Sequence, residues 1–446
     1  MSNTVEDFLQ GMGRDLDQGL IPARIFNDEK IHQLELEKIF SRGWVFIGHE
    51  SEIPNSGDYA LRYIGEDSFI FVRSKDQKIR VLFNGCRHRG MSLCRSEKGN
   101  CSVFRCPYHG WTYKNTGELF AMPAMTNAYP GLDKSEWGLL EAPQVENLHG
   151  LVFACLDETA PPLEHHLGGM KWYLDVHFGV YADQLEIIGE PNRWVVNSNW
   201  KMPAENFGAD AYHILALHQS VAELGGIPTD PETNMSGYSV KAGKGHTISM
   251  NVALNADRDG PNMPFWGLPE DVIANIKPNG LQQEQIDFAS KCVISGANVF
   301  PNMSYFIGPI SYDPKNIPFT TTLMIRQWQP RGPDKTEIWS WVFGWKGASQ
   351  EFRDLSYRTA MGTLSGPSAI IEQDDILVWE GATKVAKSAF LQQTGKSLNY
   401  QMGLGSTNSH SEVVSDWPGP GIAQYPRYDE TVQIHLYRQW LDRLLA

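Results

Sequence analysis

The sequence has no apolar run of about 18 residues, the length that a membrane-spanning helix needs. It is also poor in basic residues, because 38 Lys and Arg stand against 52 Asp and Glu, for a formal net charge of −14. A chain this acidic repels phosphate backbones and anionic lipid surfaces, so we expect no nucleic acid and no membrane among its partners. Residues 1–17 are polar and lack the apolar centre of a signal peptide, which favours a cytoplasmic protein.

Cysteine is scarce as well. Six cysteines in 446 residues do not make a disulfide scaffold. Four of them fall between residues 86 and 106, and this clustering indicates metal binding. Cys155 and Cys292 stand alone and are typical of small buried hydrophobic residues.

The length of the chain favours two domains. Residues 41–160 contain short strand-like runs separated by turns, and they predict a small all-β domain. Residues 1–40 and 161–446 predict a larger α+β domain with an antiparallel sheet and packed helices. The expected strands are 45–47, 59–64, 68–73, 79–83, 193–196, 320–328 and 336–343, and the expected terminal helices are 27–40 and one at the C-terminus.

Two stretches of the larger domain have less regular patterns. Pro203 suits the first turn of a helix, and we expect that helix to continue from Glu205 to His218. Residues 221–280 are rich in Gly, Pro and Asn and show weak periodicity. We expect them to form a lid or an entrance cover without clear elements.

A first group of candidate ligands consists of Cys86 and His88, followed after 17 residues by Cys106 and His109. In a Rieske [2Fe-2S] cluster, two thiolates bind one iron and two imidazoles bind the other. A structural zinc site is the alternative, but its usual spacing pairs Cys with Cys and His with His. Three neighbouring glycines would let the backbone approach a cluster closely: Gly85, Gly90 and Gly110.

A second group lies downstream, where His213 and His218 are five residues apart. Two His and one carboxylate hold the iron of non-heme oxygenases and leave positions open for O2. A separation of five does not place both rings on one face of a regular helix, so we expect a distortion such as a π-type turn. Two ordinary surface histidines are the alternative; Asp210 beside them and the upstream Cys/His motif favour iron.

The sequences Cys86-Arg-His-Arg-Gly90 and Cys106-Pro-Tyr-His-Gly-Trp111 resemble the Rieske motifs of aromatic-ring-hydroxylating dioxygenase large (alpha) subunits of the naphthalene, biphenyl and phenylpropionate type. The similarity covers most of the chain. It implies a [2Fe-2S] cluster, a mononuclear Fe(II), and conversion of an aromatic substrate and O2 to a cis-dihydrodiol. It also implies electrons from NAD(P)H through a separate reductase and ferredoxin, and a trimer of alpha subunits (α3), often with small beta subunits (α3β3). No nicotinamide or flavin fingerprint occurs in the chain, which agrees with an external reductase.

The resemblance also assigns residues. Asp375 falls on the position of the third iron ligand, with Asp374 as the alternative. Asp210 is expected to link His213 to His109 of a neighbouring subunit, and Glu430 to reach His88 across the same interface. Asn206 is expected near the iron, and the pocket positions are Phe207, Ile214, Gly296, Ser365 and Ile371.

The naphthalene type carries bulkier aromatic residues at the positions of Ser365 and Ile371, so ring size does not transfer. A carboxylated substrate would require a cation in the pocket, because an unpaired buried charge is costly. Lys241 and Lys244 are the only candidates for that cation, although the pattern favours exposed, solubilising lysines at both positions. An aromatic monooxygenase or hydroxylase of the same fold fits these motifs equally well, whereas a Rieske electron-transfer protein fits only the first group.

Overall fold

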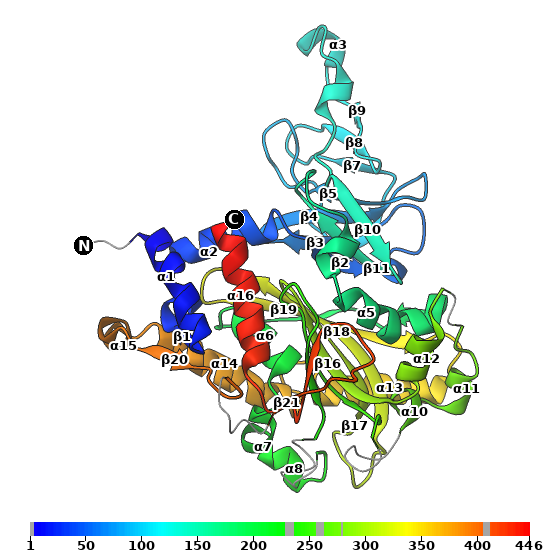
Figure 1. Ribbon diagram of the computed structural model, residues 1–446. Coiled ribbons are helices and arrows are strands. Elements are labelled where there is room, and N and C mark those ends of the chain that lie inside the picture. Colours follow the sequence, from blue (N-terminus) through cyan, green and yellow to red (C-terminus); the bar gives the residue numbers. More distant parts are fainter. Residues whose placement is uncertain (1–3, 228–235, 256–262, 278–279, 405–410) are drawn as a thin grey trace. The chain divides into compact units, whose positions relative to one another are not determined.

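The computed structural model describes residues 4–227, 236–255, 263–277, 280–404 and 411–446. The chain divides into two compact units, which are Phe40–Leu163 and the combination of Met1–Ile39 with Glu164–Ala446 (Figure 1). Within the described residues, no helix is both long enough and apolar enough to cross a membrane.

The smaller unit consists mainly of short antiparallel strands, which confirms the expected all-β class. A four-stranded sheet has the order β5-β4-β3-β6, and two three-stranded sheets have the orders β10-β11-β2 and β7-β8-β9. The strands are β2 (Val45–His49), β3 (Asp58–Ile64), β4 (Asp67–Arg73), β5 (Ile79–Phe83), β6 (Lys98–Asn100), β7 (Val103–Arg105), β8 (Thr112–Lys114), β9 (Leu119–Ala121), β10 (Gln144–Leu148) and β11 (Leu151–Cys155), with one short helix, α3 (Met125–Ala128).

The larger unit is built on a ten-stranded antiparallel sheet, as the α+β class predicts. Its order is β12-β19-β18-β17-β16-β15-β14-β22-β21, and β13 also pairs with β19. The strands are β12 (Leu185–Ile187), β13 (Asn192–Val196), β14 (Tyr238–Lys241), β15 (Thr247–Val252), β16 (Cys292–Val299), β17 (Met303–Ile310), β18 (Thr320–Pro330), β19 (Thr336–Trp345), β21 (Glu412–Val413) and β22 (Ile422–Tyr425), and β1 (Leu20–Pro22) pairs separately with β20 (Ser397–Asn399).

The predicted pair of long strands is confirmed as β18 and β19, which are buried along their whole length. Helix α13 packs on both strands. Among the described residues, the α-helices of this unit are α1 (Val5–Asp17), α2 (Glu29–Glu35), α4 (Leu163–Leu167), α5 (Met170–His177), α6 (Lys201–Ala209), α7 (His213–Leu217), α8 (Gln219–Glu223), α10 (Pro264–Gly267), α11 (Glu270–Ile273), α12 (Gln283–Ala289), α13 (Gln350–Thr363), α14 (Glu372–Ala386), α15 (Ala389–Thr394) and α16 (Thr431–Leu445).

The expectation of a cover without clear elements over residues 221–280 is wrong for much of that stretch. Strands β14 and β15 pair with each other, and their outer neighbours β22 and β16 place them inside the large sheet. Both strands mix small polar residues with apolar ones, so neither has the apolar run that marks a buried strand in a sequence. Residues 228–235, 256–262 and 278–279 of the predicted cover lie outside the described residues.

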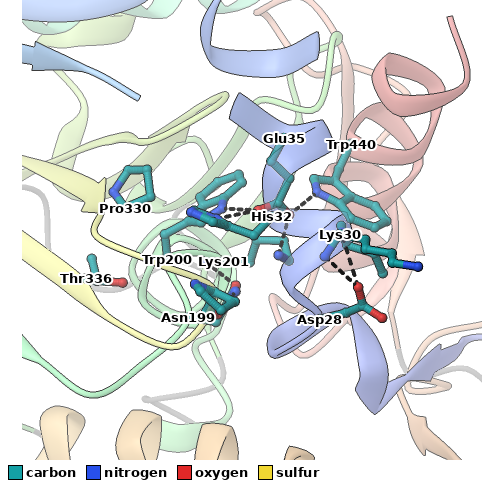
Figure 2. A network of polar contacts seen from close by, with 12 residues as sticks. Asp28, Lys30, His32, Glu35, Asn199, Trp200, Lys201, Pro330, Thr336 and Trp440 are labelled. Carbon is teal, nitrogen blue, oxygen red and sulfur yellow. Dashed lines mark hydrogen bonds and ion pairs between the residues drawn. The ribbon is translucent and has the colours of Figure 1, made fainter. Parts of the chain in front are cut away.

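A buried ionic network joins the N-terminal segment to the helix that leads into the candidate site (Figure 2). The Oε1 atom of Glu35, at the end of α2, accepts hydrogen bonds from Lys201 Nζ at 2.5 Å and Trp440 Nε1 at 2.7 Å. Its Oε2 atom accepts one from Trp200 Nε1 at 2.9 Å. Burial alone would raise the pKa of Glu35, but the charge of Lys201 and hydrogen bonds from His32, Lys201 and Trp200 hold that pKa below its ordinary value. The carboxylate therefore ties α2 and α16 to the first residues of α6.

Candidate metal centres and the adjoining cavity

Two loops of the smaller unit share one backbone pattern around the two cysteines of the motif. In each loop the cysteine amide donates to the carbonyl five residues further on, at 2.9 Å from Cys86 and 2.7 Å from Cys106. The glycine four residues after each cysteine donates back to the cysteine carbonyl, at 2.9 Å for Gly90 and 3.0 Å for Gly110. Both glycines have positive φ angles (74° and 72°), which side chains with a Cβ rarely adopt. The glycines are therefore needed to close the loops.

The loops bring the four predicted cluster residues together. The thiols of Cys86 and Cys106 are buried, and the ring centroids of His88 and His109 are 4.5 Å apart. The Nδ1 atoms of both histidines are buried and have no hydrogen-bond partner among the described protein atoms. Buried polar atoms are rarely left unsatisfied, so two such nitrogens beside two thiols fit a metal group. This donor set, which consists of two thiolate sulfur atoms and two imidazole nitrogen atoms, is that of a Rieske cluster.

A tyrosine that sequence reasoning missed lies against this group. The hydroxyl of Tyr113 accepts a hydrogen bond from the amide of Arg87 at 3.1 Å and lies 3.4 Å from Cys86 Sγ. Because the amide is a donor, the hydroxyl proton is available to the sulfur. Hydrogen bonds to cluster sulfurs tune the reduction potential. No motif marks Tyr113, because its position depends on the pairing of β8 with β7 and β9.

In the larger unit, the predicted helix from Glu205 to His218 is interrupted, so that prediction is wrong. Pro203 does lie in the first turn of α6, but the helix ends at Ala209 and Asp210 leaves the helical conformation (φ −90°, ψ 88°). The Oδ1 atom of Asp210 accepts hydrogen bonds from the amides of Tyr212 at 3.0 Å and His213 at 3.2 Å. A side chain that satisfies the amides at the start of the next helix favours such a break.

The predicted distortion between His213 and His218 is present, but not as a π turn. Helix α7 ends at Leu217, and His218 itself is non-helical (φ −97°, ψ 30°) before α8 begins. The one π-helical turn described lies elsewhere, at Leu36–Phe40. The two rings face each other with centroids 5.1 Å apart. The break thus brings together two histidines that a regular helix would separate.

The third member of this group comes from α14. Asp375 Oδ1 lies 3.6 Å from His213 Nε2 and 3.3 Å from His218 Nε2. One ligand atom from each of these residues lies within 4.8 Å of the others, a geometry able to hold a metal ion. Asp374 Oδ2 lies 3.5 Å from Nδ1 of His218, on the opposite side of the ring. The geometry therefore favours Asp375 over Asp374 as the ligand and gives Asp374 the task of orienting His218.

The Nδ1 atom of His213 faces both Asp210 Oδ2, at 3.4 Å, and the side-chain amide of Asn206, at 3.1 Å. Burial lowers the pKa of His213, but the hydrogen bond and charge of Asp210 and the charge of Asp375 raise it above its ordinary value. The group therefore favours positive charge where the three ligand atoms converge, as a metal site requires.

An ion pair supports the start of α14. Arg326 Nη1 donates to Glu372 Oε1 at 2.8 Å, and both side chains are fully buried. Arg326 also donates to the carbonyl of Leu364. Burial and the charge of Asp375 raise the pKa of Glu372 to about 7, although Arg326 opposes this shift. Because Glu372 lies one turn before Asp375, the pair helps to orient the third ligand.

A cavity of about 410 Å³ adjoins the His/Asp group, which contributes to its wall. Asn206 and Asp210 also line it, and the rest is mainly apolar. Four of the five predicted pocket residues line this cavity: Phe207, Ile214, Gly296 and Ile371. Further apolar lining residues that sequence reasoning missed are Met263, Phe306, Ile310, Phe319 and Leu364.

Ser365 is not among the residues that line the cavity, unlike the other four predicted pocket residues. It is fully buried, and its hydroxyl accepts a hydrogen bond from Ser340 Oγ at 3.2 Å. Leu364 lines the cavity in its place. The prediction for Ser365 is therefore wrong by one position, because the chain leaves α13 there and turns the serine into the core.

The two lysines named as candidates for binding a carboxylated substrate do not line the cavity. Lys241 Nζ donates to Thr431 Oγ1 at 3.0 Å instead, and Lys244 is exposed. The cavity does contain Arg427, which no sequence pattern marks. Glu430, the predicted interface residue, lies at the start of α16, and its Oε2 accepts a hydrogen bond from the amide of Met402 at 2.9 Å.

Comparison with known proteins places this geometry in context. Residues 43–142 match the family model of the Rieske [2Fe-2S] domain, and residues 167–445 match that of the ring hydroxylating alpha subunit (catalytic domain). The chain is 35% identical to the N,N-dimethyl phenylurea N-demethylase subunit alpha of Sphingobium sp. (strain YBL2), over 99% of this chain and 95% of that one. It is 32% identical to the benzene 1,2-dioxygenase subunit alpha of Pseudomonas putida, over 97% and 92%. Among solved structures, naphthalene 1,2-dioxygenase from Rhodococcus sp. bound to indole has a TM-score of 0.93 and 40% identity, covering 100% of this chain and 99% of that one.

Proposed function

The chain belongs to the alpha subunits of the ring-hydroxylating dioxygenases, and we propose that it oxidises an aromatic substrate in the cavity beside His213, His218 and Asp375. Subunits of this family combine a Rieske [2Fe-2S] cluster with a mononuclear non-heme iron. The observation that carries the proposal is the convergence of two imidazoles and one carboxylate at the wall of a mainly apolar cavity. That ligand set leaves coordination positions open, as oxygenases need.

We assign Cys86, His88, Cys106 and His109 to the cluster. The buried Nδ1 atoms and buried thiols support this assignment. We assign the mononuclear iron to His213, His218 and Asp375, supported by the short separations of their ligand atoms. Binding through Nε2 leaves the proton of His213 on Nδ1, where Asp210 accepts it. Asp374 does the same for Nδ1 of His218.

The cavity wall has its own part in the reaction. O2 activation is the chemistry that the iron supplies when it is bound, with electrons that reach it from a cluster. The apolar side chains of Phe207, Ile214 and Ile371 hold a flat ring beside the ligands and exclude water. Gly296 has no side chain, so the wall of the cavity stays open at that position. A Cβ atom there would lie 3.2 Å from the carbonyl oxygen of Phe207. The product is a cis-dihydrodiol of the substrate ring.

We further propose that electrons pass between subunits, from His109 of one subunit through Asp210 to His213 of the next, with Glu430 near His88 of the same interface. Asp210 and His109 are both partly exposed, so a neighbouring subunit can approach them. A head-to-tail contact of this kind closes into a ring, such as an α3 trimer, with or without beta subunits as α3β3. A ferredoxin and an NAD(P)H-dependent reductase supply the electrons.

One relative favours a second candidate function. The alpha subunit that shares 35% identity with this chain is named for N-demethylation of an N,N-dimethyl phenylurea. The same ligands and cavity would then oxidise an N-methyl group and release formaldehyde in place of adding two hydroxyls to a ring.

Turnover with a ferredoxin, a reductase, NADH and O2 tests both candidates. The panel consists of one-, two- and three-ring arenes together with an N,N-dimethyl arylurea. Diols from the arenes support the first function, and formaldehyde from the urea alone supports the second. Absence of any product, in protein that contains both kinds of iron centre, would contradict the proposal.

A further inference from the structure

We propose that the preferred substrate is an aromatic compound that carries a carboxylate, and that Arg427 binds this carboxylate inside the cavity. The inference rests on the proposed function, because it names the substrate class of the same cavity. It assigns to the guanidinium of Arg427 the recognition of substrate charge.

Arg427 is held in a defined place on the cavity wall. It follows β22, and its Nη1 donates to Oδ1 of Asn251 on β15 at 2.9 Å. The orientation of Asn251 is set in turn, because its Nδ2 donates to the carbonyl of Ser236 at 3.0 Å. All three residues line the cavity that also borders the His/Asp group. The cation is therefore a positioned element of this wall.

The backbone makes room for this pair. Gly237 has a φ angle of 121°, and a Cβ built on it would lie 3.2 Å from Cδ of Arg427 and 3.1 Å from Nδ2 of Asn251. Both approaches are closer than ordinary van der Waals contact, and a side chain there would also require strained backbone. A glycine at this position thus keeps the arginine and the asparagine where they are.

The chemistry of the wall points to an anion. Arg427 is the one Lys or Arg among the described lining residues, and it faces a mainly apolar surface. A carboxylate that enters such a cavity loses its hydration, and a cation on the apolar part of the wall offsets much of this cost. A guanidinium presents its donors as a planar fork that matches the two oxygens of a carboxylate.

Both acids of the cavity are directed at the histidines, since Asp375 faces His213 and His218, and Asp210 faces His213. Burial lowers the pKa of Arg427 only to about 10, so the side chain stays charged at neutral pH.

The test compares matched substrates in holoenzyme with its ferredoxin and reductase. The panel pairs benzoate, 2-naphthoate and biphenyl-4-carboxylate each with its methyl ester and with the arene in which methyl replaces the carboxylate. The variants are Arg427→Met and, as the control that removes one exposed charge outside the cavity, Lys244→Met. The readouts are kcat/KM for each compound and the dissociation constant of the acid, from anaerobic equilibrium dialysis.

We expect at least one acid to have a kcat/KM at least tenfold above that of its methyl arene. Arg427→Met should lower kcat/KM for that acid, and weaken its binding, at least tenfold, because truncating one partner of a buried charge pair is costly. The methyl arene should change less than threefold in the same variant, which shows that the variant is folded. Lys244→Met should leave both compounds unchanged.

Three results would overturn the inference. They are a preference of the wild type for esters or methyl arenes over every acid, an equal loss for acid and methyl arene in Arg427→Met, and full retention of acid turnover in that variant. The first two leave the proposed function intact, because arenes are still oxidised. If no compound is oxidised, the proposed function fails, and equilibrium dialysis then decides the inference. Binding of the acid to the wild type, and its loss in Arg427→Met, would support the inference. Absence of binding to the wild type would overturn it.

Discussion

The Nδ1 atom of His213 lies 3.4 Å from the Oδ2 atom of Asp210, while the Oδ1 atom of that carboxylate accepts the amide of His213 itself. One side chain therefore starts helix α7 and orients the imidazole that this helix presents. This double contact explains why a helix break occurs in the middle of the candidate iron site, and it makes Asp210 testable in two separable ways.

Asp210→Ala should leave both metal centres occupied and lower turnover at least a hundredfold, because it removes the proposed link between His213 and a neighbouring cluster. Iron content, the visible spectrum of the cluster and turnover are the readouts. Asp210→Asn is the matched control for capping, because its side-chain oxygen can still accept the amides that start α7. In both variants, we expect the reductase to reduce the cluster. We then expect the cluster to remain in its reduced state. Substantial turnover in Asp210→Ala would rule out the link.

Asp375 and Asp374 should differ sharply when each is replaced by alanine. Asp375→Ala removes a proposed ligand and should lose most of the mononuclear iron and all turnover. Asp374→Ala removes only the partner of His218 Nδ1, so it should retain more iron than Asp375→Ala while losing about 10- to 100-fold in metal affinity or activity. Metal analysis after dialysis against a chelator separates the two. Equal iron content in both variants would contradict the assignment.

Tyr113→Phe should keep the cluster and shift its reduction potential to a more negative value. The hydroxyl lies 3.4 Å from Cys86 Sγ, and a hydrogen bond to a cluster sulfur stabilises the more negatively charged, reduced state. Potentiometric titration of the visible spectrum measures the shift. Tyr108→Phe is the control, because Tyr108 is largely exposed. An unchanged potential in Tyr113→Phe would show that the hydroxyl does not act on the cluster.

Lys201→Met should destabilise the larger unit by about 3–5 kcal/mol, because it leaves the buried carboxylate of Glu35 without its cation. The double variant with Glu35→Leu removes both charges and should recover much of this loss. Thermal unfolding of the three proteins is the measurement. If the double variant is no more stable than Lys201→Met, the network in Figure 2 does not act through charge.

Glu205 should make the stability depend on pH. Burial raises the pKa of this carboxyl from an ordinary 4.5 to about 8 in the folded chain. Because the folded state binds the proton of Glu205 more tightly than the unfolded state does, protonation stabilises the fold. This contribution to the free energy of unfolding is fully present below pH 4.5. It is lost as pH rises toward 8, by about 1.4 kcal/mol per pH unit. Glu205→Gln lacks this titrating carboxyl, so melting temperatures between pH 5 and 8 should fall more for the wild type than for the variant. Parallel curves would contradict the shift.

The ligands that lie close together in the sequence could be predicted from it. Cys86 with His88, and Cys106 with His109, are separated by one or two residues, so each pair occupies one loop, and the structure brings the two loops together. Asp375 lies far from His213 along the chain and was identified only by family resemblance. No local pattern connects α14 to α7, since their proximity depends on the tertiary fold.

Other features depended on tertiary contacts that a sequence does not display. The break at Asp210 follows from a side chain that satisfies the next helix, which outweighs the helix-favouring residues around it. Strands β14 and β15 are buried by pairing on both sides, although each contains polar residues. Arg427 joins the cavity because β22 pairs with β14, and a lone arginine after a short strand carries no signal of that kind.

Ring dioxygenation beside His213, His218 and Asp375 is tested most directly by oxidising an arene under ¹⁸O2 and analysing the product by mass spectrometry. We expect the wild type to form a diol that carries two labelled oxygen atoms, and we expect Asp375→Ala not to form it. A product with a single labelled oxygen atom, or a labelled diol formed equally well by Asp375→Ala, would contradict this expectation.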